Sequence, residues 1–313
     1  DVVAEFLDQQ LRSVLVDGLV DGDHHAHVEQ RLHQIRALFG HTVGEFADGD
    51  RLGHHHVAHL LFARLRRAAL TTAFLLAGAL ERGELKPGTK LIEATSGNTG
   101  IALAMIARLC NVEIELVMPA NSTKERVLTM QAYGATVTLT SADGSMEEAI
   151  DYAHEQVAKG GYLMLNQFAN PDNYTAHYKS TGPEIWRDTN GAVTHFVSSM
   201  GTTGTIMGVS RYLKEQNSNV QIIGAQPTDG SRIPGIRRWP KEYLPKIFEP
   251  ERVDKVVDVS EADAVAMTRR LAKEEGVFAG MSSGGAVHIA AQTAAQLEGG
   301  IIVAIICDRG DRY

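Results

Sequence analysis

Cysteine is nearly absent from this chain, since only Cys110 and Cys307 occur among 313 residues. Both lie in apolar runs, so neither a disulfide framework nor a cysteine-based zinc site is expected, and this usage is typical of a reducing cytoplasm. Long apolar runs are absent too, because the longest, residues 68–80, contains two threonines and a glycine and is too short to cross a bilayer. The acidic start does not predict a signal peptide.

Basic residues are fewer than acidic residues, with 30 Lys and Arg against 38 Asp and Glu. The formal net charge of −8 argues against nucleic acid or an anionic membrane surface as the main partner. The length predicts one large domain or two intermixed domains, because a single core stops growing near this size.

Lysine is missing altogether from the first 85 residues, and Lys86 is the first in the chain. The same stretch holds nine of the 13 histidines: His24, His25, His27, His33, His41, His54, His55, His56 and His59. Imidazoles can bind zinc, copper or nickel. No ligand spacing such as His-Glu-x-x-His accompanies them, so a polar, solvated segment is the favoured interpretation and no metal is expected. Apolar spacing predicts helices over residues 2–20 and 29–39.

From Arg82 onward, short apolar runs alternate with helical spacing, which predicts an α/β fold with mostly parallel sheets covered on both faces. Strands are expected at residues 91–94, 114–118, 135–140, 162–165, 195–198, 220–225 and 301–307. Helices are expected at residues 99–109, 122–133, 145–160, 206–213, 261–275 and 284–297. Capping boxes at Ser122–Glu125 and Ser145–Glu148 open two of these helices. Residues 227–250 are rich in glycine, proline and charge, as binding loops often are.

The most distinctive turn is Gly201–Thr205, which follows an expected strand and precedes an expected helix. Free backbone N–H groups and the positive end of the helix dipole suit a phosphate there, and threonine hydroxyls add donors. The turn is neither a P-loop nor a Rossmann fingerprint, because the required lysine and third glycine are absent.

Two other turns open helices in the same way. Thr95–Thr99 offers hydroxyls, an amide and free N–H groups that could hold a carboxylate, although a simple helix cap is the alternative. Gly280–Gly285 is the third. In an α/β chain such turns are expected to meet at the carboxyl ends of parallel strands.

With these residues in view, residues 82–313 resemble the B-type cysteine synthases of the tryptophan-synthase-β-like group of pyridoxal-phosphate (PLP) enzymes. The resemblance is carried by Glu93–Gly100, Asn166–Phe168, Phe196–Thr205, Ile233–Pro240 and Ser282–Gly285. It implies PLP fold type II, with two three-layer αβα domains. A smaller movable domain would span residues 67–167, and a larger domain would comprise residues 168–313 together with the divergent residues 1–66.

The resemblance also implies roles for individual residues. The cofactor phosphate would lie against Gly201, Thr202, Thr203, Gly204 and Thr205. Asn98 would bond the phenolic oxygen of the cofactor and Ser282 its ring nitrogen. The amino-acid carboxylate would be held by Thr95, Ser96, Thr99 and Gln167, and Arg237 would lie in the loop that admits the sulfur donor.

The implied reaction is a β-replacement that converts O-acetylserine and sulfide or thiosulfate to cysteine or S-sulfocysteine. The resemblance further implies small-molecule substrates and a cytoplasmic homodimer. A dehydratase or a cystathionine β-synthase-like lyase is an alternative, which the Arg237–Trp239 loop disfavours. A non-catalytic protein that binds PLP or an amino acid is another.

Two features that the resemblance implies are missing, namely the Schiff-base lysine upstream of Thr95 and the strand that begins the family's fold. Counting back leads to Leu65 or Ala68, and neither can form an imine. Lys86 and Lys90 belong to a surface turn, so no catalytic residue is identified. A translation in a shifted frame over residues 1–70 is the favoured explanation. A natural homologue without turnover, or an unrelated segment that substitutes for the lost strand, are the alternatives.

Overall fold

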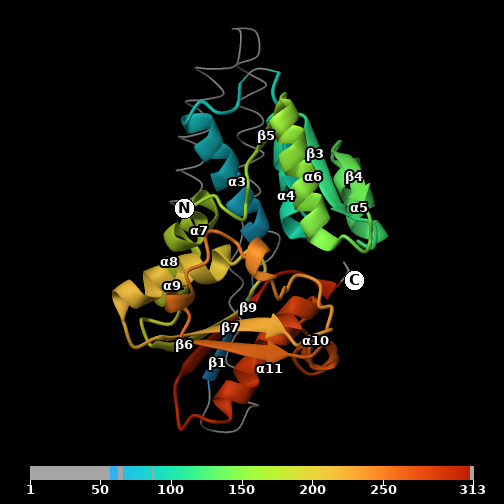
Figure 1. The fold of residues 1–313 in the computed structure, drawn as a ribbon. Helices are drawn as coiled ribbons and strands as arrows, with labels where there is room; N and C mark the ends of the chain where they lie inside the picture. Colours follow the sequence, from blue (N-terminus) through green and yellow to red (C-terminus); the bar gives the residue numbers. More distant parts are fainter. Residues whose placement is uncertain (1–56, 63–65, 87, 311–313) are drawn as a thin grey trace. The chain divides into compact units, whose positions relative to one another are not determined.

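The computed structural model describes residues 57–62, 66–86 and 88–310 (Figure 1). The expected helices over residues 2–20 and 29–39, eight of the nine clustered histidines and Leu65 lie outside these ranges. The described elements form two compact units. Of the described residues, one unit comprises 68–86 and 88–172, and the other comprises 57–62, 66–67 and 173–310.

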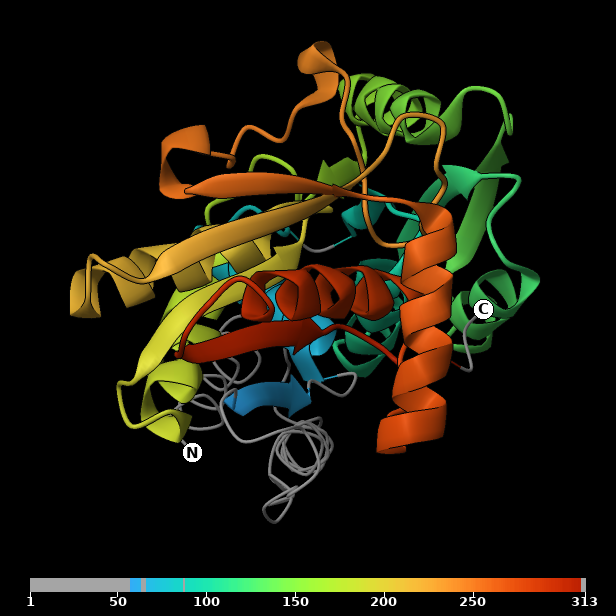
Figure 2. The ribbon, with the colours of Figure 1, turned by 90° about the horizontal axis from the view of Figure 1, so that it is seen from below.

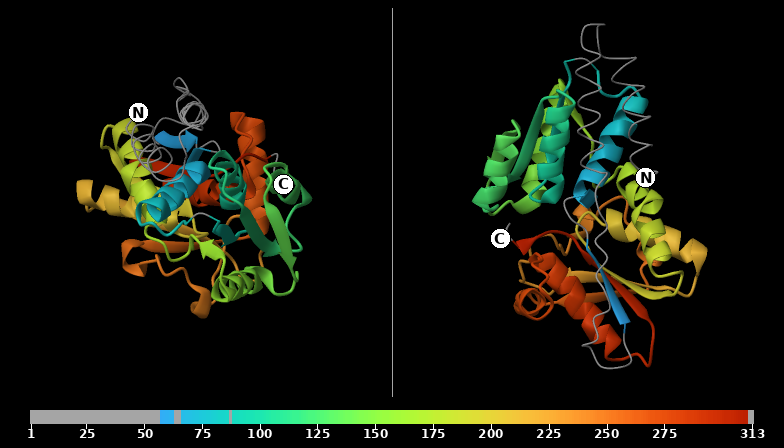
Figure 3. Two further views of the ribbon diagram at one scale, coloured as in Figure 1. Left: turned by 90° about the horizontal axis from the view of Figure 1, so that it is seen from above. Right: turned by 180° about the vertical axis from the view of Figure 1, so that it is seen from behind.

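The unit of residues 68–172 is built on a four-stranded parallel sheet in the order β4-β3-β2-β5. Helix α6 packs on β2 and β3, while α4 and α5 pack on β3 and β4 (Figures 1 and 3). The elements are α3 (Arg66–Glu81), β2 (Lys90–Ala94), α4 (Asn98–Leu109), β3 (Ile114–Pro119), α5 (Lys124–Ala132), β4 (Thr136–Thr140), α6 (Ser145–Lys159) and β5 (Tyr162–Met164).

The second unit has a five-stranded parallel sheet in the order β1-β9-β6-β7-β8. Its helices lie along the sheet (Figure 2). Its elements are β1 (Val57–Phe62), α7 (Asp172–Lys179), α8 (Thr181–Asp188), β6 (Val193–Ser199), α9 (Gly204–Gln216), β7 (Gln221–Pro227), the 3₁₀ turns η2 (Lys241–Tyr243) and η3 (Pro250–Arg252), β8 (Lys255–Val259), α10 (Glu261–Glu275), α11 (Met281–Ala294) and β9 (Ile301–Ile306).

The interior strand β9 shows why this sheet is covered on both faces. Ile302 and Ile306 pack in one apolar cluster with residues of α10 and α11, such as Leu271. Val303 and Ile305 pack in a second cluster with residues of α8 and α9. Because successive side chains of a strand point to opposite faces, a continuous apolar run serves both layers. The predicted α/β class with parallel sheets is therefore confirmed.

Several elements differ from the predictions. The strands β1 and β8 and the helices α3, α7 and α8 were not predicted. The run of residues 68–80 forms most of α3, and its side chains from Leu70 to Leu80 are buried. In the part of the chain that the structure describes, no helix combines the length and apolar character that crossing a bilayer requires.

Both predicted capping boxes are wrong, although the two helices predicted to follow them, α5 and α6, are present. At α5 the residue before the helix is Thr123, in an extended conformation, and its side chain makes no capping bond. At α6 the corresponding residue is Gly144, and Ser145 adopts a φ of 51°. The hydroxyl of Ser141 accepts the N–H of Gly144 and donates to Glu148 instead.

Helices α7 and α9 of the second unit pack closely at Gly208 of α9. A Cβ at this position would lie 2.2 Å from the carbonyl oxygen of Tyr174 in α7, which side chains do not tolerate. We expect Gly208→Ala to lower the free energy of unfolding by about 1–3 kcal/mol, because the helices must move apart.

Urea denaturation measures this change, and Gly299→Ala is the matched control. No atom lies within 4 Å of a Cβ at Gly299, and its φ lies outside the left-handed region that side chains avoid. The free energy of unfolding of this control should therefore stay within about 0.5 kcal/mol of that of the parent. Equal stability of the two variants would contradict the packing described here.

Candidate active site

The turn between β6 and α9 has the features of an anion site. Thr203 precedes the helix with a φ of 68°, a left-handed conformation that a β-branched residue rarely adopts. Its hydroxyl oxygen is buried and has no hydrogen-bond partner among the described residues. A strained backbone and an unsatisfied buried hydroxyl at a helix N-terminus together indicate a ligand with acceptor atoms. The turn therefore fits a phosphate group.

Helix α7 supports this turn from behind. The Asn173 amide donates to the Thr202 hydroxyl over 3.3 Å, and a Cβ at Gly204 would lie 1.9 Å from Asn173 Oδ1. The buried ring of His177 lies between two hydroxyls, with Nε2 at 3.2 Å from Thr205 Oγ1 and Nδ1 at 3.0 Å from Thr181 Oγ1. A side chain at position 204 would thus displace the Asn173 amide from the turn, and His177 holds the hydroxyl of Thr205.

The start of α11 and the loop of residues 233–239 adjoin the same turn. The Ser199 hydroxyl donates to the carbonyl of Ser282 over 2.6 Å. A Cβ at Gly235 would lie 3.1 Å from the Ser282 hydroxyl. Trp239 Nε1 donates to the Gly201 carbonyl over 2.7 Å. In this unit, therefore, the structure brings together the predicted phosphate turn, Ser282 and the loop that carries Arg237.

Arg237 itself is attached to the phosphate turn by its backbone. Its N–H donates to the Met200 carbonyl over 2.9 Å. Its guanidinium carbon lies 5.2 Å from the centre of the Trp239 ring, a cation–π contact that holds the side chain along the loop.

The helices that begin at the three predicted binding turns differ from most other helices in the charge of their first turn. The first turns of α4, α9 and α11 contain no acidic residue, and α3 shares this feature. The first turns of α5, α6, α7, α8 and α10 all contain one. Acidic side chains normally neutralise the positive helix terminus. No acidic side chain in the first turn of α4, α9 or α11 would therefore repel an external anion.

In the other unit, the Thr95 turn follows β2 directly and opens α4 at Asn98. Thr95 is buried, and Ser96 is held by Arg126, whose Nη1 donates to the Ser96 carbonyl over 3.1 Å. Gln167, which was predicted to share this site, is also buried, and its Nε2 donates to the Ala94 carbonyl over 3.0 Å. The structure therefore brings the Thr95 turn and Gln167 together within one unit.

The resemblance implies no role for Glu93, yet its carboxyl group is, together with Arg126, one of the two charged groups among the described residues that are buried near the Thr95 turn. Its carboxylate accepts the N–H of Asn166 over 3.0 Å and that of Gln167 over 2.9 Å. Burial raises the pKa of Glu93 to about 7, although these backbone bonds oppose the shift. A carboxylate inside the otherwise apolar strand 91–94 is the sequence signal that could have identified it.

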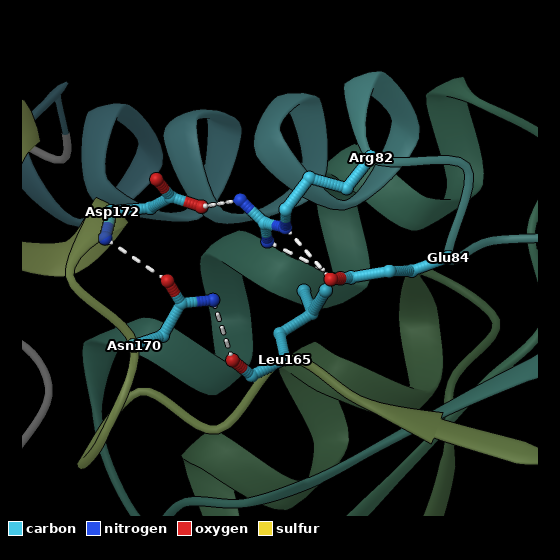
Figure 4. A network of polar contacts seen from close by, with 5 residues as sticks. All are labelled: Arg82, Glu84, Leu165, Asn170 and Asp172. Carbon is cyan, nitrogen blue, oxygen red and sulfur yellow. Dashed lines mark hydrogen bonds and ion pairs between the residues drawn. The ribbon is translucent and has the colours of Figure 1, made fainter.

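The segment after Gln167 is held by a second set of polar contacts (Figure 4). Asn170 donates to the Leu165 carbonyl over 2.9 Å and accepts the N–H of Asp172 over 3.0 Å. Arg82, at the end of α3, donates to Asp172 over 2.9 Å and also bonds Glu84. The segment from Leu165 to Asp172 is thus fixed at both of its ends.

Lys90, the lysine that most closely precedes the Thr95 turn in sequence, lies at the far end of strand β2 from it. Lys90 begins β2, whereas the turn leaves the opposite end of that strand, about 13 Å away at the usual rise per residue. Lys90 pairs with Glu113 over 2.6 Å, and that bond raises the pKa of Lys90. A raised pKa makes an amine a poorer nucleophile at neutral pH. Lys90 therefore does not fit the role of the missing lysine.

The described residues contain no group of three His, Cys, Asp or Glu side chains able to hold a metal ion. Sequence reasoning also missed Asn173 and His177, which support the phosphate turn from α7, and gave Trp239 of the 233–240 motif no role of its own. No periodicity or motif indicates Asn173 and His177, because their contacts arise only when distant segments pack.

Comparison with known proteins identifies relatives of this arrangement. A family described as pyridoxal-phosphate dependent enzyme matches residues 66–308. Cysteine synthase B of Pseudomonas aeruginosa is 61% identical over 232 residues, which cover 74% of this chain and 78% of the relative. Cysteine synthase B of Escherichia coli is 56% identical over 247 residues, with coverages of 79% and 80%.

Solved structures agree with these relatives. A cysteine synthase of Entamoeba histolytica is similar with a TM-score of 0.73 and 35% identity, covering 79% of this chain and 76% of its own. A lysine-to-alanine mutant of O-ureido-L-serine synthase with O-ureido-L-serine bound is similar with a TM-score of 0.75 and 32% identity, with coverages of 79% and 79%.

Glu93 gives a prediction for stability against pH. Its folded-state pKa of about 7 lies above the ordinary 4.5, so between these values the folded chain retains a proton that the unfolded chain has released. Stability therefore falls as pH rises through this window, by at most about 3 kcal/mol. Urea denaturation of the parent and of Glu93→Gln at several pH values measures the contribution, which the variant should lack. A parent curve that rises relative to the variant across this window would contradict the assignment.

Proposed function

Because the chain belongs to the family of pyridoxal-phosphate dependent enzymes, and within it to the cysteine synthases, we propose a β-replacement on an O-acylated serine as its function. The substrates proposed are O-acetylserine and sulfide or thiosulfate, which would give cysteine or S-sulfocysteine. One observation carries the proposal. Thr203 has a left-handed backbone and a buried hydroxyl without a hydrogen-bond partner among the described residues, and it precedes a helix, α9, whose first turn has no acidic side chain.

The residues present fit the phosphate of PLP. Gly201–Thr205 would hold that group through backbone N–H groups and hydroxyls, and Ser282 would lie at the ring nitrogen. A serine there, in place of a carboxylate, would leave that nitrogen largely unprotonated. When bound, PLP supplies the electron sink for breaking bonds at the α and β carbons of the amino acid. Asn98 is proposed at the phenolic oxygen.

The proposed substrate site lies at the start of α4. Thr95, Ser96, Thr99 and Gln167 would hold the carboxylate of the amino acid, using the free N–H groups of the helix as well as side chains. Arg237 would contribute positive charge on the side of the sulfur donor. Orientation and the exclusion of water are what this chain's own residues supply. We also retain, as proposals, a movable domain of residues 67–167, a cytoplasmic location and a homodimer.

The chain does not fit covalent attachment of the cofactor in the family's manner. No lysine precedes Lys86, and Lys90 begins β2 at the end opposite the Thr95 turn. Loss of that amine would remove both the covalent anchor and the base that takes the α-proton. A protein that binds PLP and an amino acid without turnover is therefore the second candidate function.

Binding and turnover separate the two candidates. We expect PLP to bind reversibly, as measured by isothermal titration, and to be removed by dialysis. Turnover of O-acetylserine with sulfide should be at least about 100-fold below that of E. coli cysteine synthase B assayed in parallel, because a general base is missing. Comparable turnover, or one lysine labelled stoichiometrically after borohydride reduction, would exclude the non-catalytic candidate. No binding of PLP would overturn the proposed function.

Thr205→Val tests the phosphate site directly. Loss of this hydroxyl is expected to weaken PLP binding about tenfold, because a hydrogen bond to a charged group is removed. Fluorescence titration with PLP measures the affinity. Thr293→Val, at the far end of α11, makes the same chemical change where the hydroxyl bonds only the Ile289 carbonyl, and it should bind PLP like the parent. Equal affinities of both variants would contradict the site.

A further inference from the structure

We propose that Glu93 is a positioning residue for the amino-acid carboxylate site, acting by fixing the backbone at Asn166 and Gln167 to strand β2. This inference rests on the proposed function, because it concerns the residues assigned there to the substrate carboxylate. Neither the motif nor the resemblance gives Glu93 this role.

The geometry is that of an anion held by consecutive backbone N–H groups. The N–H groups of Asn166 and Gln167 point to different oxygens of the Glu93 carboxylate, at 3.0 and 2.9 Å. Asn166 adopts a φ of 55°, the left-handed conformation that turns neighbouring N–H groups toward one point. The carboxylate is buried, so water does not replace it as the acceptor. Glu93 thus determines the path of the chain as it leaves β5.

Strand β2 contacts the Gln167 segment at two consecutive residues and then enters the proposed site. Glu93 accepts the backbone N–H groups, the Ala94 carbonyl accepts the Gln167 amide, and Thr95 begins the carboxylate-binding turn. A shift of the segment therefore moves Gln167 relative to Thr95. Since a displacement of 1 Å suffices to lose an oriented contact, the position of Gln167 depends on Glu93.

The carboxylate is required chemically as well as sterically. Both of its oxygens accept, and each receives one N–H. A glutamine of the same shape offers one accepting oxygen and one NH₂ group, so a donor would face the second N–H. One buried N–H would then lose its acceptor and the segment would move to satisfy it.

The remainder of the segment has its own supports, which makes the inference testable in a folded protein. Asn170 bonds both Leu165 and Asp172, and Arg82 bonds Asp172 (Figure 4). These contacts do not involve Glu93. A change at Glu93 should therefore release the backbone at residues 166–167 without unfolding the unit.

The test of this positioning role compares the parent with three variants: Glu93→Gln, Glu93→Asp and the control Glu115→Gln. Glu115 lies on the neighbouring strand β3 and accepts bonds from the hydroxyls of Tyr162 and Thr138, away from the proposed site. Isothermal titration of the full chain, loaded with PLP, measures the affinity for O-acetylserine at a pH above the Glu93 pKa of about 7, where the carboxylate is ionised. Hydrogen exchange measures the protection of the amides of residues 166 and 167.

We expect Glu93→Gln to weaken O-acetylserine binding about tenfold while PLP affinity changes by less than about twofold. Exchange at residues 166 and 167 should accelerate, and Glu115→Gln should match the parent in both measurements. Glu93→Asp keeps two accepting oxygens and should recover part of the lost affinity. A packing role predicts the opposite order, because glutamine, not aspartate, has the size of glutamate.

Unchanged O-acetylserine affinity in Glu93→Gln, or weaker binding by Glu93→Asp than by Glu93→Gln, would overturn the inference and leave the proposed function intact. If the unsubstituted chain binds PLP but no O-acetylserine, the proposed carboxylate site fails, and the role of Glu93 fails with it. If Glu93→Gln does not fold, the exchange and affinity of Glu93→Asp against Glu115→Gln decide, and equality of those two overturns the inference.

Discussion

Parallel pairing of strands is the constraint on which the described part of this protein depends. In a parallel sheet all carboxyl ends lie on one edge, so the turn after β2 and the chain leaving β5 meet at the same edge of one sheet. The turn after β6 has the same relation to the second sheet. Helices that begin there direct their unpaired N–H groups toward that edge. Short turns, rather than long loops, can therefore carry both proposed binding functions.

The proposed sites lower the stability of the chain in which they lie. Thr203 holds a left-handed backbone and an unsatisfied hydroxyl, Glu93 carries a buried charge, and three helix starts lack neutralising acids. Each feature is unfavourable without a partner but favourable with an anion or a converging set of N–H groups. Such local conflicts between stability and sequence are expected where a protein binds its ligands.

Much of this architecture could be predicted from residues, and the reasons for the exceptions are physical. Continuous apolar runs such as Ile301–Ile306 identified buried strands because both faces of the sheet are covered. The edge strand β8 was missed because its burial is partial, and α7 and α8 were missed because they are short and polar. The turns were recognisable from glycine and hydroxyl residues. Their supporting contacts, such as His177 on Thr205, depend on packing between segments that local sequence does not encode.

Strand β1 illustrates how differently fold and chemistry depend on the identity of side chains. It pairs with β9 over six residues at the margin of its sheet, through main-chain groups that every residue except proline carries. Any segment able to extend can complete such a margin, whatever its side chains. An amine that must reach a reacting atom has no such substitute among Leu65, Ala68 and their neighbours. A sheet margin can thus accept many different sequences, whereas chemistry that depends on a single nitrogen requires one particular side chain at one particular place.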